Sequence, residues 1–186
     1  SFMPHRNQRR RTRRATRGAS LASRSLRCEG LEDRRLLSVS PVGNQFQVNT
    51  YVGGNQITPR IAMDSTGNYV AVWESTGEDG SLRGIYAMRF DAAGNPLLRD
   101  ASAIAAPSGN PYEFRVNTYT TDDQWEPDIA IDTDGDFVIT WTSMGQAAYN
   151  NFSVYAQRFN AAGAPQGSEF RVNSSTGTDQ RASQVA

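Results

Sequence analysis

The chain has 186 residues, and its 19 Arg balance its 19 Asp and Glu. This zero net charge hides two different parts, because residues 1–40 hold 11 Arg against three acids and residues 41–186 hold eight Arg against 16 acids. The single Cys (Cys28) excludes an intrachain disulfide, and the single His (His5) leaves the acidic part without an imidazole for a catalytic triad or a zinc site.

Residues 1–40 are expected to form a basic leader or targeting segment that is disordered or partly helical. An export signal normally follows its positive start with an apolar run of about 7 to 15 residues, and this leader has no such run. Its Arg clusters could instead bind nucleic-acid phosphates, but no aromatic residues alternate with them and nothing downstream resembles a base reader. We therefore expect no nucleic-acid partner.

One segment of the leader, LEDRRLLSV at 31–39, resembles the LEPR-XLL segment near the start of large secreted and surface proteins of planctomycete-type bacteria. Leu36 and Leu37 match the Leu pair of that segment, whereas Asp33 stands where it has Pro. The resemblance extends to the Arg-rich lead-in. It implies an exported or cell-surface bacterial protein.

The chain after the leader is a tandem repeat. The phrase QFQVNTY at 45–51 returns as EFRVNTY at 113–119 and as EFRVNSS at 169–175. Between these phrases a second set of residues recurs 68 or 69 positions later, which relates 56–96 to 124–165. A unit of this size cannot bury its apolar face alone, so such a period is typical of stacked or radially arranged units.

The repeat predicts three units after the leader. Residues 41–112 form the first unit, with a loop insertion at 97–112, and residues 113–168 form the second. Residues 169–186 are the start of a third unit that stops inside an expected strand. We therefore interpret the chain as the amino-terminal piece of a longer protein.

Each unit is expected to hold four short antiparallel strands. Phe114 and Val116 alternate with polar residues, which indicates a half-buried strand, and Phe46 and Val48 do the same in the first unit. An Asp-x-x-Gly turn, well suited to a tight hairpin, follows the second strand. The strands expected in the second unit are 114–117, 127–131, 137–141 and 154–159.

The third strand of the first unit is apolar on both faces. Tyr69, Ala71 and Trp73 lie on one side, and Val70 and Val72 lie on the other. Small antiparallel sheets covered on both faces are typical of propeller blades. We predict an all-β fold of tandem four-stranded antiparallel units, as propeller-like blades in an incomplete array. A row of small β-sandwiches is the alternative, although such modules usually need about 100 residues.

Residues 45–186 also resemble the propeller-like repeats of very large bacterial surface proteins. The resemblance rests on the recurring phrase, on the Asp-x-x-Gly turn and on the Tyr-Ala-x-Arg-Phe strand at 86–90 and 155–159. Such arrays often precede cadherin-like, calcium-binding or dockerin modules. The resemblance implies a fold and a cell-surface location more than any reaction.

A candidate metal site lies in the turn of the second unit. Asp132, Asp134 and Asp136 place three carboxylates at alternate positions, and such oxygen ligands are what Ca²⁺ requires. The pattern then departs from an EF-hand loop, because Phe137 stands where that loop needs Gly and Ser143 where it needs Glu. A Ca²⁺ site and a hairpin turn with solvated acids are the two interpretations of this pattern.

Trp125 is the candidate ligand-binding residue. We expect it on a polar connector, and its counterparts in the other units are Ile57 and Arg181. An unrepeated aromatic side chain on a loop is a candidate contact for a sugar. Trp73 and Trp141 occupy the same strand position of their units and are expected in the core.

These features predict a non-catalytic, secreted or cell-surface repeat protein that serves in adhesion. Its partner is expected to be an extracellular polysaccharide or a cell-surface protein, bound by the loops at 76–84, 122–126 and 145–153. Two alternatives stay open, the non-catalytic start of a secreted glycoside-acting enzyme and a structural spacer. No apolar run reaches the roughly 18 residues of a membrane span, so no transmembrane segment is expected.

Overall fold

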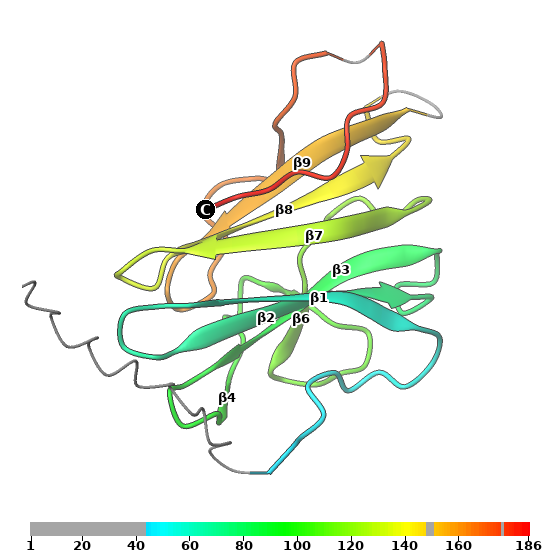
Figure 1. Cartoon of the computed structure of the whole chain (residues 1–186). Helices are drawn as coiled ribbons and strands as arrows, with labels where there is room; N and C mark the ends of the chain where they lie inside the picture. Colours follow the sequence, from blue (N-terminus) through cyan, green and yellow to red (C-terminus); the bar gives the residue numbers. More distant parts are fainter. Residues whose placement is uncertain (1–43, 148–150, 176) are drawn as a thin grey trace, which may run out of the picture. The chain divides into compact units, whose positions relative to one another are not determined.

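The computed structural model describes residues 44–147, 151–175 and 177–186. The leader at 1–40 lies outside these residues, so its expected conformation stays a prediction. The described part is all-β, as predicted, with ten strands in two antiparallel sheets (Figure 1). It contains no helix, and therefore none long and apolar enough to cross a membrane.

The first sheet runs from cyan to green in Figure 1 and has the hydrogen-bonded order β1-β2-β3-β6-β5, with β4 paired to β3. The insertion expected as a loop at 97–112 contributes β5, which pairs with β6 and widens the sheet. The strands of the first sheet are β1 (Gln56–Met63), β2 (Tyr69–Thr76), β3 (Arg83–Phe90), β4 (Pro96–Leu97), β5 (Ile104–Ala105) and β6 (Glu113–Arg115).

The second sheet has four strands in the order β10-β9-β8-β7. Three of them cover the strands expected from the repeat, and each is longer than the sequence pattern indicated. The strands are β7 (Gln124–Ile131), β8 (Phe137–Met144), β9 (Phe152–Phe159) and β10 (Phe170–Arg171).

The two sheets share a backbone irregularity. The pairing register shifts once between β1 and β2 and once, at the equivalent place, between β7 and β8. A residue inside each shift has positive φ, 54° at Thr58 and 54° at Glu126, and the equivalent Ala182 of the third copy has 55°. Left-handed backbone at a non-glycine residue is strained by roughly 1–3 kcal/mol. Its recurrence therefore marks a bulge that belongs to the repeat.

The recurring phrase supplies the last strand of the sheet that precedes it. β6 pairs with β3, and β10 pairs with β9, both antiparallel. The first copy follows no earlier sheet in the described residues, and 44–55 form no strand. The strand expected around Phe46 and Val48 is thus wrong, and Phe46 is 54% exposed. A strand needs a partner edge, and the described residues offer none to this copy.

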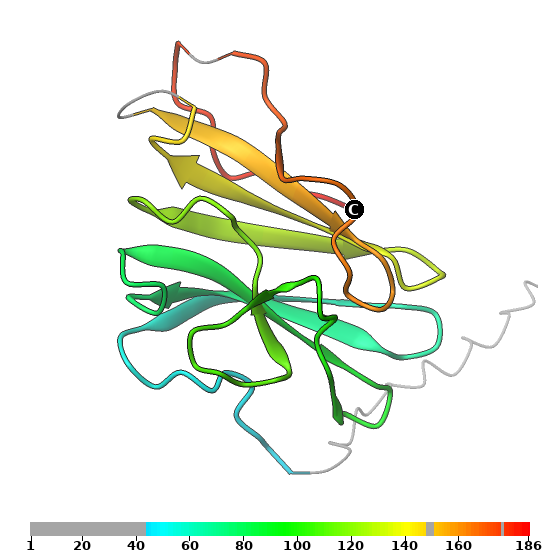
Figure 2. The same ribbon diagram turned by 180° about the vertical axis from the view of Figure 1, so that it is seen from behind.

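The two sheets pack face to face, and β7 lies across β1, β2 and β3 (Figures 1 and 2). The core between them is apolar and well buried. Its members from the first sheet include Val70, Val72, Ile85, Ala87, Phe114 and Val116, and those from the second include Ile129, Phe137, Ile139, Trp141, Tyr155 and Phe159. The other face of the first sheet, called the far face, carries Ala71, Trp73, Tyr86, Met88 and Phe90, with Val48 and Tyr112 packed against it.

The two ends of each strand differ in their connections. At one end, tight turns begin at Asp64, Asp91, Asp132 and Asn160. At the other end, called the loop end, the connections are longer. Its described residues are 44–55, 77–82, 116–123, 145–147, 151 and 172–175.

Candidate functional site

Three acidic side chains of the first sheet and its loop end are buried. Glu74 is 2% exposed, Glu78 is 5% exposed and Glu113 is fully buried. A buried carboxylate is unfavourable unless a cation or several hydrogen bonds compensate it. Glu74 has such a cation, whereas Glu78 and Glu113 form no ion pair within the part of the chain that the structure describes.

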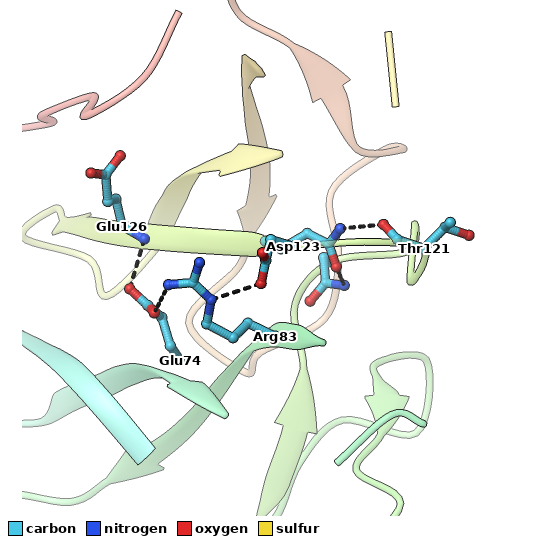
Figure 3. Close-up of polar contacts among 7 residues, drawn as sticks. Glu74, Arg83, Thr121, Asp123 and Glu126 are labelled. Atoms are coloured by element: carbon cyan, nitrogen blue, oxygen red, sulfur yellow. Dashed lines mark hydrogen bonds and ion pairs between the residues drawn. The ribbon is translucent and has the colours of Figure 1, made fainter. Parts of the chain in front are cut away.

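Arg83 at the start of β3 pairs with Glu74 and connects the two sheets. Its Nη1 lies 3.2 Å from Glu74 Oε2, and its Nε lies 2.7 Å from Asp123 Oδ1 (Figure 3). Glu74 Oε1 in turn accepts the backbone N–H of Glu126 at 2.9 Å. The hydrogen bond to Asp123 and the nearby acidic charges raise the pKa of Arg83. This arrangement connects the two sheets through one guanidinium.

Trp125 lies in β7 rather than on a connector, so the loop position predicted for it is wrong. β7 starts one residue before it, ahead of the bulge. Its indole is 9% exposed, with the Arg83 guanidinium 4.9 Å from the ring centroid and Phe152 packed edge-on at 5.1 Å. The ring thus packs against Arg83 and Phe152, and its ligand-binding role stays a prediction. Trp73 and Trp141 lie in the core, as expected.

Two acids of the predicted calcium turn accept hydrogen bonds from backbone N–H groups. Asp132 Oδ1 accepts the N–H groups of Asp134 and Asp136, both at 3.0 Å, and Asp136 Oδ1 accepts the N–H of Ala161 at 2.8 Å. Among the described residues, no three His, Cys, Asp or Glu side chains form a group that could hold a metal ion. The structure therefore does not bring Asp132, Asp134 and Asp136 together as a calcium site.

Glu78 and Glu113 are two buried acids whose charges interact, and sequence reasoning missed them. Glu113 Oε2 accepts the N–H of Thr50 at 3.2 Å and also the Thr50 hydroxyl. Glu113 Oε1 and both Glu78 oxygens are buried without a hydrogen-bond partner among the described residues. Burial raises the pKa of Glu78 to about 7, and the charge of Glu113 raises it further. Ser75 has the opposite, lowering effect, although it forms no hydrogen bond with Glu78. Burial also raises the pKa of Glu113.

The second sheet contains the same arrangement with one different residue. Glu169 Oε2 accepts the N–H of Thr118 at 2.6 Å and its hydroxyl at 3.0 Å, as Glu113 does from Thr50. Gln146 Nε2 donates to Glu169 Oε1. Gln146 occupies the position of Glu78, 68 residues later. This match between the repeats was the sequence signal that could have revealed the pair.

The recurring Asn of the phrase organises the loop end. Asn117 is fully buried, and its Oδ1 accepts the N–H of Ile85 at 2.8 Å. Its Nδ2 donates to Tyr119 O at 2.7 Å and to Gln124 Oε1 at 3.2 Å. One side chain thus joins β3, the following loop and β7, which explains why the phrase keeps its Asn.

A cavity of about 400 Å³ lies between the sheets and is called the inter-sheet groove. Its size falls within the range of roughly 300–1,000 Å³ that is usual for small-ligand sites. The polar side chains that line it include Arg115, Thr118, Gln146, Gln157 and Glu169. They provide hydrogen-bond donors and acceptors of the kinds that bind hydroxyl groups.

A comparison of the chain with protein-family models, with curated proteins and with solved structures finds no match.

Proposed function

We propose that the two sheets are successive blades of an incomplete β-propeller. The proposed protein is a non-catalytic, secreted or cell-surface repeat protein of a planctomycete-type bacterium that binds polysaccharide. The observation that carries this proposal is the way in which the sheets stack.

The stacking is head to tail. The contacting face of the first sheet carries Val70, Val72, Ile85 and Ala87, and that of the second carries Ile129, Ile139, Trp141 and Tyr155. The repeat counterparts of the latter four are Ile61, Ala71, Trp73 and Tyr86, which lie on the far face of the first sheet. Unlike faces therefore meet, and a contact of this kind can recur from unit to unit or close into a ring.

The far face of the first sheet is less covered than its counterpart. Ile61 and Met63 are 63% and 60% exposed, whereas Ile129, the counterpart of Ile61, is 6% exposed. Exposed apolar side chains on a sheet face favour a further packed element. A further blade fits this face with the contacts seen between the two sheets.

The inter-sheet groove is the proposed polysaccharide site. Arg115 is half-buried there, and its Nε donates to Asn117 O at 3.0 Å, which orients the guanidinium. A guanidinium held in this way keeps donors for sugar hydroxyl groups. Gln146 lines the same groove, and it belongs to the loop at 145–153 that the sequence predicts to bind a partner.

The arrangement favours binding over catalysis. Residues 44–186 hold neither His nor Cys, and Glu78 and Glu113 do not line the groove. A glycosidase needs two carboxylates that face each other across a bound sugar. The groove brings a single carboxylate, Glu169, to its lining.

A glycan array probed with the chain and with Arg115→Ala tests the proposal. We expect binding to a polysaccharide fragment that Arg115→Ala weakens about 10-fold or more, because hydrogen bonds to a charged group contribute about 1.5–3 kcal/mol. Arg60→Ala is the control, since Arg60 is exposed and lies outside the groove.

Three outcomes contradict the proposal in different ways. The absence of any bound glycan removes the binding function and leaves the structural spacer. Binding that Arg115→Ala leaves unchanged places the site elsewhere. The release of shortened products from a bound polysaccharide shows a glycoside-acting enzyme.

A further inference from the structure

The two sheets carry equivalent acidic sites, which differ in whether the residue next to the buried Glu can donate a hydrogen bond. In the second sheet, the amide of Gln146 donates to Glu169 Oε1. In the first sheet, Glu78 takes the place of Gln146, and the equivalent acceptor, Glu113 Oε1, has no partner in the described chain. An ionised carboxylate has no proton to donate, whereas a protonated one has an O–H.

Among the described residues, the titratable groups that interact with Glu78 are two acids and a tyrosine. Asp79 lies in its own loop, Glu113 comes from β6 and Tyr86 from β3. The Tyr86 hydroxyl is buried without a partner in the described residues, and its pKa is raised by burial and by the charges of Glu78 and Asp79. Two ionised carboxylates side by side in such a setting are unfavourable.

Among the described residues, no cation acts on the pKa of Glu78 or Glu113. Arg83 pairs with Glu74 and Asp123. Arg115 acts on Tyr86, and its Nε is bonded to Asn117 O. From the segment 44–55, Thr50 contributes uncharged donors to Glu113. Within the described part of the chain, a proton is therefore the charge that remains to compensate the pair.

We propose that Glu78 and Glu113 share one proton at neutral pH, with the protonated Glu78 donating to Glu113 Oε1 as Gln146 donates to Glu169. Glu113 also holds Thr50, so the pair connects the loop 77–82 to β6 and to the segment 44–55. Loss of the proton places a second negative charge inside this connection. The loop end of the first sheet is thus sensitive to pH, and that of the second sheet is not.

The direction of the pH dependence follows from the raised pKa. Glu78 has an ordinary pKa of 4.5 and a folded-state pKa of about 7, so the folded protein holds a proton that the unfolded chain has lost. The stabilisation is complete below pH 4.5 and declines as the pH rises through about 7. The turn acids Asp64, Asp91 and Asp100 have lowered pKa values. Their contribution to stability is lost as the pH falls into the acidic range, which is the opposite direction.

Thermal unfolding of the whole chain at pH 5.5 and pH 8.5, with Glu78→Gln as the variant, tests the proposal. We expect the wild-type Tm to be about 3–6 °C lower at pH 8.5, and we expect Glu78→Gln to abolish that difference by raising the Tm at pH 8.5. Gln146→Glu is the reciprocal variant, and it should introduce a smaller pH dependence because Gln146 and Glu169 are only half-buried.

A carbon-13 titration of the Glu carboxyl groups of the wild type gives a readout that needs no variant. One Glu carboxyl should titrate near pH 7, as one step of a coupled pair. The proposal is overturned if every Glu carboxyl titrates below pH 6, or if Glu78→Gln keeps the wild-type pH dependence. It is also overturned if CaCl₂ at pH 8.5 stabilises the wild type and not Glu78→Gln, since the pair then holds a cation.

Discussion

At the scale of single residues, Arg83 is the side chain on which the contact between the sheets most depends. It neutralises the buried Glu74, bonds to Asp123 immediately before β7 and covers the indole of Trp125. Exposed ion pairs contribute about 0–1 kcal/mol, but removal of one partner of a buried pair leaves an uncompensated charge. Arg83 is about one-third exposed and Glu74 is buried, so the pair lies between these limits.

Arg83→Met should lower the free energy of unfolding by about 2–3 kcal/mol, because it leaves Glu74 without its cation. Urea denaturation followed by tryptophan fluorescence measures this change. Arg60→Met is the matched control and should change stability by less than about 1 kcal/mol, since Arg60 is half-exposed and its Nε lies 3.8 Å from Asp128. Equal effects of the two variants would show that the buried charge of Glu74 is unimportant.

Single residues were also where sequence reasoning was least complete. Trp125 looked like a loop residue because it lies among the polar residues of 122–126. Its contacts with Arg83 and Phe152 depend on the packing of the two sheets, which no local pattern reveals. Glu78 could have been found, because the repeat aligns it with Gln146.

At the scale of elements, the hairpin turns follow closely from the sequence. The Asp-x-x-Gly pattern predicts a turn in which Asp accepts backbone N–H groups, and both Asp64 and Asp132 do so. Gly135 has φ +89°, and a Cβ added there would lie 3.1 Å from Ala161 Cβ. Gly167 has φ +79° with open space around it. A substitution at Gly135 therefore introduces backbone strain and crowding, whereas one at Gly167 introduces backbone strain alone.

Gly135→Ala should lower the free energy of unfolding by about 2–3 kcal/mol, through left-handed strain and the contact with Ala161. Gly167→Ala carries the strain alone and should cost about 1 kcal/mol, because the variant also restricts the unfolded chain. Chemical denaturation of both variants measures the difference. A larger effect at Gly167 would contradict the packing of the turn against Ala161.

The bulges were not predicted, and neither was the sheet to which each recurring phrase adds its strand. The bulge places different residues at its left-handed position, Thr58, Glu126 and Ala182, none of which is a glycine. No turn chemistry marks it, so only the shared register of the two sheets shows it. The phrase 113–119 begins the second unit in the sequence, yet its strand β6 completes the first sheet, because hydrogen bonds to β3 are available there.

At the scale of the molecule, the equivalent tryptophans of the two sheets have different surroundings. Trp141 is fully buried in the core between the sheets. Trp73 occupies the same strand position on the far face, where it belongs to the smaller cluster against which Val48 and Tyr112 pack. Trp141 is therefore covered by the facing sheet, whereas the cluster of Trp73 is covered by side chains from outside the strands.

Trp141→Ala should lower the free energy of unfolding by about 3–5 kcal/mol, as is usual for a large aromatic side chain in a packed core. Trp73→Ala should cost at least about 1 kcal/mol less, since its surroundings can collapse into the space more readily. Urea denaturation of both variants measures the difference. Equal losses would indicate that the far face is as firmly covered as the core between the sheets.

The sequence by itself determined the long strands, the tight turns and their repetition, because alternation of apolar residues and Asp-Gly turn chemistry act over a few neighbours. The tertiary structure alone decided which faces meet, that Trp125 is enclosed and that Glu78 lies beside Glu113. These outcomes depend on residues that are far apart in the chain and become neighbours only when the sheets pack. Burial then changes the chemistry of a loop carboxyl whose sequence neighbours are polar.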